Sequence, residues 1–330
     1  MNSMFKPWAH IQWFSMGAGV LALILLPSFV ENDEIRKWMD ILMVAILATS
    51  WNFIGGLTGY PSFAPAAFFG LGAYTTAILM NAGFNFFITL GIGACLGALV
   101  ALALGIPILR LRGHYFAIAT FGVAEFFREL ADNLRITGGG DGINLPQITG
   151  GPDYFTRFFY FSMLGVAVLA VLTQYFVTRH RLGYGLVAIR ENEDAAAMTG
   201  VDTTKYKIIA FVLSSIFPAM GGGVYAYRAA FLEPIDVFDV LFSIKAIVMS
   251  MLGGVGTVMG PLVGAVMMEY LSDYLWGAFT EFHSAFLGII IVLVVLFIPR
   301  GLMTLSQEVK SRGWGSLGLI LKSNIQRFKV

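Results

Sequence analysis

Ten apolar runs, each close to the roughly 20 residues that an α-helix needs to cross a bilayer, follow one another along this chain. They cover residues 11–30, 38–55, 60–81, 86–109, 114–130, 158–178, 206–227, 238–252, 255–276 and 283–299. Only 12% of the 330 residues are charged, against roughly 25% in a soluble globular protein. A soluble fold is therefore excluded, and the sequence predicts an all-α, polytopic membrane helix bundle of about ten transmembrane helices.

The distribution of Lys and Arg predicts how these spans are oriented. Fourteen of the 21 basic residues lie in segments on the side of the N-terminus, six lie on the opposite side, and Lys245 falls within a span. Because basic residues accumulate on the cytoplasmic side of a membrane protein, both termini are expected in the cytoplasm. That arrangement requires an even number of spans, which ten satisfies.

The same pattern predicts one transmembrane domain, 1–310, followed by a cytoplasmic or interfacial C-terminal tail, 311–330. Within the domain, 131–157 is expected to be an outward loop, and 179–205 a charged cytoplasmic segment. The net charge of +1 gives no basic surface for nucleic acid, and the single Cys95 excludes a disulfide framework. No G-x-x-x-x-G-K-[ST] phosphate loop occurs, so the chain itself is not expected to hydrolyse ATP. The four histidines lack metal-ligand spacing.

Residues 185–200 in the cytoplasmic segment are expected to form a short helix. Arg190 and Asp194 are spaced for an i,i+4 ion pair, and Gly200 is placed to end the helix. Such a helix could dock a cytoplasmic partner, or it could be an ordinary amphipathic loop helix. The pattern alone leaves both interpretations open.

Pro61 and Pro65 make a regular helix impossible throughout 59–74, because each proline lacks a backbone donor. Broken backbone at membrane depth is tolerated where it is buried in protein or lines a polar cavity, which would suit a translocation pathway. The alternative is a proline that begins a helix at the inner interface.

Two ionisable residues fall within predicted spans. Glu125 is the better candidate for function, because an unpaired carboxylate in hydrocarbon is costly; the alternative is a local pair with Arg128. Lys245 either extends its side chain to the interface or pairs with a carboxylate such as Glu125 or Glu269.

Glycines at helical spacing predict close contacts between spans. Gly93-x-x-x-Gly97 and the repeat formed by residues 256, 260 and 264 place small residues on one helix face. Gly253–Gly256 together with Pro261 predict a tight turn or a helix break.

Several motifs resemble one known family. Residues 109–122, LRLRGHYFAIATFG, resemble the LRLRGxYxAIxTLG stretch of the branched-chain amino acid (LIV, hydrophobic amino acid) ABC transporter permease family. Residues 251–261, MLGGVGTVMGP, resemble its LGGxGSxxGPxxGA stretch. Further matches occur at 137–143, 188–193, 205–207 and 210–214. They keep the family's order from about Gly55 to about Gly301, about three quarters of the chain.

The resemblance includes a motif in the cytoplasmic segment and one departure. Asp194-Ala195-Ala196, three further residues and Gly200 resemble the EAA-x-x-x-G coupling motif of ABC importer permeases, with Asp in place of Glu. Where the family usually reads GxxSLGHAAFFGIGAY, residues 59–74 read GYPSFAPAAFFGLGAY. Ala64-Pro65 thus replaces Gly-His, so the resemblance does not fix the substrate.

The resemblance implies a permease subunit of an ABC importer that moves branched-chain or related amino acids across the bacterial inner membrane by ATP-driven alternating access. Its implied partners are a second, homologous permease, a periplasmic substrate-binding protein and two ATPase subunits. ATP and Mg would be bound by those ATPases, so this chain is expected to be no enzyme and to hold no cofactor or metal. Alternatives are a permease of the same family for urea, amides or small organic acids, or an ion-coupled secondary transporter.

The resemblance also assigns roles to residues. Coupling to the ATPases would involve Arg190, Glu193, Asp194, Ala195, Ala196 and Gly200. Polar side chains on the broken helix and nearby spans are candidates for the substrate path: Asn52, Tyr60, Ser62, Thr75, Thr76, Thr120 and Glu125.

Overall fold

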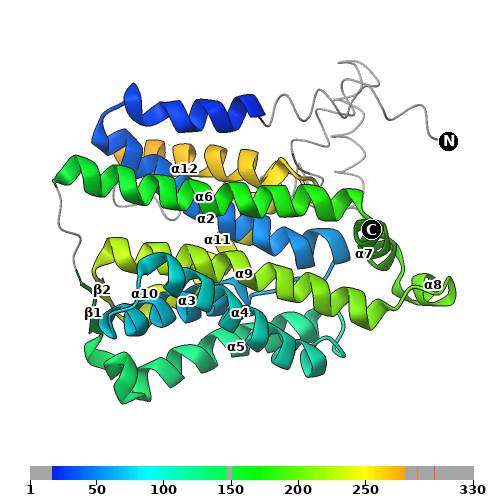
Figure 1. The fold of residues 1–330 in the computed structure, drawn as a ribbon. Coiled ribbons are helices and arrows are strands. Elements are labelled where there is room, and N and C mark those ends of the chain that lie inside the picture. Colours follow the sequence, from blue (N-terminus) through cyan, green and yellow to red (C-terminus); the bar gives the residue numbers. More distant parts are fainter. Residues whose placement is uncertain (1–16, 147–150, 279–287, 289–300, 302–330) are drawn as a thin grey trace.

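The computed structural model describes residues 17–146, 151–278, 288 and 301, and within these ranges the chain forms a bundle of helices (Figure 1). The first helix, Gly17–Ser28, ends in the 3-10 turn η1 (Leu26–Ser28). The other elements are α2 (Asn32–Trp51), the π-helix η2 (Asn52–Gly56), α3 (Pro65–Asn81), α4 (Phe86–Ile108), α5 (His114–Asn133), η3 (Arg135–Thr137), η4 (Gly139–Asp141), β1 (Ile143–Asn144), α6 (Pro152–Arg179), α7 (Arg181–Glu191), α8 (Glu193–Met198), α9 (Thr203–Ala229), β2 (Phe231–Leu232), α10 (Pro234–Val237), α11 (Val240–Gly253) and α12 (Gly260–Ala278). The predicted all-α class is confirmed.

Four of the described helices are long and apolar enough to cross a bilayer: Asn32–Gly56, formed by α2 and η2, and then α4, α6 and α9. Helices α3, α5, α11 and α12 coincide with four further predicted spans. The expected span 11–30 is described only from Gly17 onward, and 283–299 lies outside the described residues except for Gly288. The count of ten spans therefore stays a prediction.

The two ends of the bundle differ. At one end, β1 pairs with β2 in a short antiparallel ribbon that joins the segment before α6 to the segment after α9. At the other end lie α7 and α8, which connect α6 to α9 (Figure 1). Helices α6 and α9 thus run between the ribbon and the α7–α8 end.

The centre of the bundle is the packing of α9 against α3 and α4, which glycines make possible. A methyl group at Gly72 would lie 1.9 Å from the carbonyl oxygen of Ala219, and one at Gly222 would lie 2.0 Å from that of Phe69. On α4, a methyl group at Gly97 would lie 3.1 Å from the Cβ of Ala219. The backbones approach so closely because no side chain intervenes, as predicted for the Gly93-x-x-x-Gly97 pair.

Helices α11 and α12 are separated by the predicted glycine break. Gly254, with φ of 135°, caps α11, and Gly256 has a φ of 78°, a region that favours glycine. A methyl group at Gly264 would lie 1.9 Å from the carbonyl oxygen of Met249. The close contact predicted from the glycine repeat is confirmed for Gly264, but Gly256 lies in the turn before α12 and not on a helix face.

Pro65 begins a helix, as the helix-start interpretation predicted, whereas Pro61 lies in the non-helical segment before it. Residues 59–63 are not helical, and α3 begins at Pro65, where a missing backbone donor costs nothing. The expected span therefore begins five residues later than Tyr60. A second interruption, the π-helix η2 at the end of α2, was not anticipated from the sequence.

Candidate functional site

The segment 185–200, predicted to lie in the cytoplasm, forms two short helices instead of one. The chain is extended at Asn192, with φ of −163°, and the Asn192 side chain caps α8 by accepting a 3.0 Å hydrogen bond from the Ala195 amide. The predicted Arg190–Asp194 pair is wrong, because this break places the two residues on different helices. Arg190 and Asp194 take other partners.

The prediction that Gly200 ends this helix is confirmed. Gly200 has a left-handed φ of 88°. Its amide donates to the carbonyl of Ala197 at 3.0 Å, and the amide of Val201 donates to that of Ala196 at 3.1 Å. These two bonds define a Schellman motif, so α8 has a fixed C-terminus.

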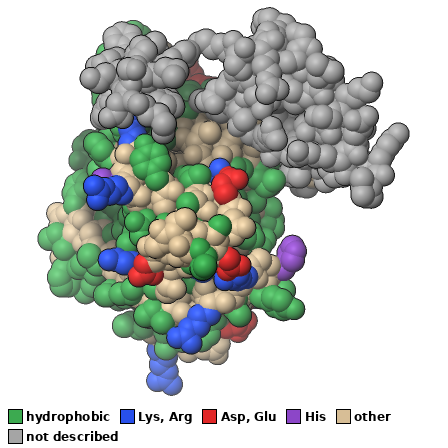
Figure 2. All heavy atoms as spheres, turned by 90° about the vertical axis from the view of Figure 1, so that its right-hand side faces the viewer, with side chains coloured by type: hydrophobic (Ala, Val, Ile, Leu, Met, Phe, Trp, Pro, Cys, Tyr) green, Lys and Arg blue, Asp and Glu red, His purple; other side chains and the backbone are tan. Residues whose placement is uncertain are grey.

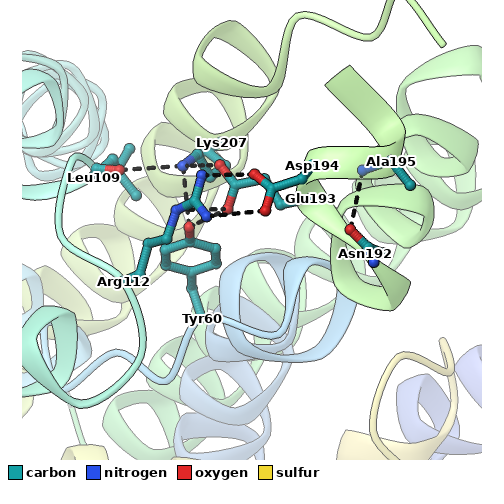
Figure 3. Close-up of polar contacts among 8 residues, drawn as sticks. All are labelled: Tyr60, Leu109, Arg112, Asn192, Glu193, Asp194, Ala195 and Lys207. Atoms are coloured by element: carbon teal, nitrogen blue, oxygen red, sulfur yellow. Dashed lines mark hydrogen bonds and ion pairs between the residues drawn. The ribbon is translucent and has the colours of Figure 1, made fainter. Parts of the chain in front are cut away.

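A buried ion pair ties α8 to the bundle (Figure 3). The Nζ of Lys207, on α9, lies 2.7 Å from Oε1 of Glu193 and donates to the Tyr60 hydroxyl at 3.1 Å and to the Leu109 carbonyl at 3.2 Å. The Tyr60 hydroxyl in turn donates to Oε2 of Glu193. The side chains of Lys207 and Glu193 are only 5% and 14% exposed. All three donors of the ammonium are thus satisfied.

Arg112, in the connection between α4 and α5, extends this group of charges to the surface. It lies 3.8 Å from Glu193 and 3.1 Å from Asp194, whose side chain is largely exposed. We call Tyr60, Arg112, Glu193 and Lys207 the anchor cluster. It joins α8 to α9, to the segment before α3 and to the segment before α5.

The anchor cluster holds Glu193 ionised. Burial alone would raise the pKa of the Glu193 carboxyl, but hydrogen bonds from Lys207 and Tyr60 and the charges of Lys207 and Arg112 outweigh burial, so its pKa is lowered. A buried charge is tolerated when it is paired and hydrogen-bonded. The anchor cluster is therefore a charged contact at neutral pH.

Figure 2 shows the surface at the α7–α8 end of the bundle. Basic and acidic side chains lie next to each other there, and they surround a central area without charged side chains. The outer residues of α8 are available for contact: Met198 is 90% exposed, and Asp194, Ala195 and Ala197 are exposed as well. Tyr184 on α7 is 70% exposed. Helix α8 therefore presents one face to the outside and buries Glu193 and Ala196 on the other.

The structure separates the six residues that the resemblance assigns to coupling. Glu193 and Ala196 face the bundle, whereas Asp194 and Ala195 face outward. Arg190 has contacts on both sides: its Nη1 donates to the Gly56 carbonyl at 3.0 Å, whereas its Nη2 pairs with the exposed Glu191 at 3.2 Å.

The candidates for the substrate path do not form one group. Tyr60 belongs to the anchor cluster. The hydroxyl of Ser62 accepts from the Ala64 amide, and that of Thr120 accepts from the Phe63 amide, so both stabilise the turn that precedes α3. Asn52 bonds to the turn between α11 and α12, accepting from the Gly256 amide at 2.8 Å.

The remaining candidates are held locally or are buried. Thr75 donates to the Leu71 carbonyl of its own helix. Glu125 pairs with Arg128 at 2.7 Å, which is the local ion pair considered above as the alternative to a functional role. The hydroxyl of Thr76 is buried and has no hydrogen-bond partner among the described residues. Lys245 is exposed and forms no ion pair with the described part of the chain. None of these contacts tests a role in substrate passage.

Sequence reasoning did not single out Lys207 and Arg112. Both lie in motifs that carried the family resemblance, 205–207 and 109–122, and Glu193 lies in a third, 188–193. The fold brings these three motifs together in the anchor cluster. Within the described ranges, no group of three His, Cys, Asp or Glu side chains could hold a metal ion.

Known proteins are similar to this chain over most of its length. Residues 38–295 match the family described as branched-chain amino acid transport system / permease component. The high-affinity branched-chain amino acid transport system permease protein LivM of Salmonella typhimurium is 31% identical over 322 residues, covering 89% of this chain and 75% of that protein. LivM of Escherichia coli is 31% identical, covering 87% and 75%. The D-allose transport system permease protein AlsC of Escherichia coli is 25% identical, covering 74% and 76%. No solved structure matches the chain.

Proposed function

Because this chain belongs to the family of permease components of branched-chain amino acid transport systems, we propose that it is the membrane subunit of an ATP-driven importer for branched-chain or related amino acids. Support for this substrate class comes from the LivM proteins, which are 31% identical to it. We place it in the bacterial inner membrane with both termini in the cytoplasm, in accord with its excess of basic residues on that side.

The proposed complex contains four further subunits. LivH of Escherichia coli, named as a branched-chain amino acid permease protein, is 23% identical over 78% of this chain, and a homologous second permease would pair with this one. Two ATPase subunits would bind ATP and Mg on the cytoplasmic side. A periplasmic binding protein would deliver the amino acid to the opposite end, where the β1–β2 ribbon lies.

One observation carries the proposed mechanism: α8 has an exposed outer face and a buried ionic contact on its inner face. We propose that an ATPase subunit contacts the outer face around Asp194, Ala195 and Met198. When the ATPases close on ATP, they would displace α8. Glu193 would then move Lys207 on α9, and with it the helices that pack closely against α9, so that access alternates between the two sides of the membrane.

Co-purification tests this proposal. The tagged chain, isolated from membranes together with its operon-encoded neighbours, is expected to bring down two ATPases, and their activity is expected to rise with binding protein and leucine, isoleucine or valine. Stimulation only by urea, an amide, a small organic acid or a sugar would keep the transporter and replace the substrate. A chain that purifies alone and transports in liposomes under an ion gradient would overturn the proposal.

A matched pair of variants tests the docking face. Met198→Glu places a charge in the middle of the proposed contact and is expected to reduce co-purification of the ATPases. Ile235→Glu is the control, because Ile235 is also apolar and exposed, at 61%, but lies on α10, at the ribbon end of the bundle. Equal loss in both variants would contradict docking at α8.

A further inference from the structure

Arg190 makes a second connection between the α7–α8 segment and the bundle, separate from the anchor cluster. Its Nη1 donates to the Gly56 carbonyl at 3.0 Å, at the end of the π-helix η2. Its aliphatic stem lies beside Gly59, where a methyl group would be 3.1 Å from the Arg190 Cγ. The side chain therefore reaches across the end of α2.

The guanidinium also lies against the glycine turn between α11 and α12. A methyl group at Gly256 would be 2.6 Å from Nη1 of Arg190 and 3.1 Å from the Gly56 carbonyl oxygen. Gly59 and Gly256 have φ values of 77° and 78°, so both positions favour glycine for their backbone conformation as well. A larger residue at either position would crowd the Arg190 side chain in its present place.

The π-helix and the glycine turn are themselves joined by side chains. Asn52 accepts from the Gly256 amide at 2.8 Å and donates to the Thr257 carbonyl at 2.9 Å. Gln174 of α6 donates to the same carbonyl at 3.1 Å. Both Asn52 and Gln174 are fully buried, where charge-free amide bonds of this kind are stabilising because no water competes for them. These hydrogen bonds join the π-helix and α6 to the turn between α11 and α12.

The two connections reach different helices. The anchor cluster binds α9 and the segments before α3 and α5, whereas Arg190 binds the end of α2 and, through Asn52, the turn between α11 and α12. The helical structure is interrupted at Asn192, which lies between Arg190 on α7 and Glu193 on α8. A π-helix is a common place for a helix to bend, because its backbone hydrogen bonds are already rearranged.

We infer that Arg190 is a positioning residue that transmits movement of the cytoplasmic segment to the π-helix of α2 and to the α11–α12 turn. This inference rests on the proposed function. The Arg190 side chain is 32% exposed and its Nη2 pairs with Glu191 at 3.2 Å; the inference concerns its other guanidinium nitrogen, Nη1, which donates to the bundle at Gly56. Asn52 completes the connection. When the α7–α8 segment moves, the anchor cluster then moves α9, and Arg190 moves the end of α2 and the turn between α11 and α12.

Spin labels at the lipid-facing surface test the inference in the assembled transporter. In a Cys95→Ser background, labels at Leu99→Cys on α4 and Met267→Cys on α12 report the distance between these two helices; the native side chains are 62% and 47% exposed. In the otherwise wild-type complex this distance is expected to change between the nucleotide-free state and the state that vanadate traps after ATP hydrolysis. Arg190→Ala and Asn52→Ala are each expected to abolish most of that change, while the ATPases still co-purify.

Transport supplies the second readout. Arg190→Ala is expected to lower amino acid uptake about tenfold, the loss typical of removing one charge-assisted hydrogen bond, and Arg190→Lys is expected to restore part of it because a lysine can still donate to one carbonyl. Arg181→Ala is the control, since Arg181 is an exposed arginine on the same helix. Loss of the ATPases in Arg190→Ala, or an unchanged distance response and uptake, would overturn the inference. A wild-type chain that brings down no ATPase would instead reject the proposed function.

Discussion

Replacing Lys207 by methionine should be among the most damaging single changes at the α7–α8 end of this protein. Methionine keeps the apolar stem of the side chain but removes the ammonium, which makes three hydrogen bonds, to Glu193, Tyr60 and the Leu109 carbonyl. The side chain of Glu193, which is 14% exposed in the native structure, then loses its nearest cation. The Leu109 carbonyl loses a hydrogen-bond donor.

The structure sets the size of the effect. Removing one partner of a buried ion pair costs about 3–5 kcal/mol, because it leaves an uncompensated charge. Glu193 keeps its hydrogen bond from Tyr60 and has Arg112 at 3.8 Å, so Lys207→Met should lie at the lower end, about 3 kcal/mol. The double variant Lys207→Met with Glu193→Gln removes both charges, and should cost about 1 kcal/mol, well below the sum of the single variants.

Equilibrium unfolding in detergent micelles, followed by circular dichroism with increasing dodecyl sulfate, measures these differences. Asp194→Asn is the control, because the Arg112–Asp194 pair is 61% and 78% exposed and should contribute less than about 1 kcal/mol. The reasoning is refuted if Lys207→Met is no more destabilising than Asp194→Asn, or if the two single effects simply add in the double variant.

Three further predictions concern the same bundle. Gly200→Ala should destabilise α8 by about 1 kcal/mol, because alanine is strained at a φ of 88°. The control Thr199→Ala, one residue earlier, should destabilise it less, and unfolding titrations of the two variants measure the difference. Gly222→Leu should prevent assembly of the bundle, since a side chain there collides with the Phe69 carbonyl at 2.0 Å; a monodisperse peak of normal size in gel filtration would argue against it. Because the pKa of Glu193 is lowered from 4.5, its ionic contacts stabilise the folded state above that pH and are lost in more acidic solution as the carboxyl is protonated. The stability difference between wild type and Glu193→Gln should therefore shrink as the pH falls from 7 to below 4.5, and a pH-independent difference would contradict this.

Local features of the fold were predictable from the sequence because short-range physics decides them. The start of α3 at Pro65 follows from a proline's missing donor, and the end of α8 at Gly200 from the conformational freedom of glycine. The Glu125–Arg128 pair joins residues three positions apart on one helix. The wrong prediction in this class, the Arg190–Asp194 pair, assumed a continuous helix, and the capping side chain of Asn192 favours a break there instead.

By itself, the sequence determined that this protein is a helical bundle in a membrane, since so few charges cannot cover a soluble surface and the apolar runs have the length of membrane-spanning helices. It also predicted close helix contacts at Gly97 and Gly264, but not those at Gly72 and Gly222 in the centre of the bundle. Only the tertiary structure decided that Lys207, Glu193 and Tyr60 meet, and that Arg190 donates to the Gly56 carbonyl. These partners lie as many as 147 positions apart in the chain, and which of them come within hydrogen-bond distance depends on how the helices pack against each other, which no local pattern records.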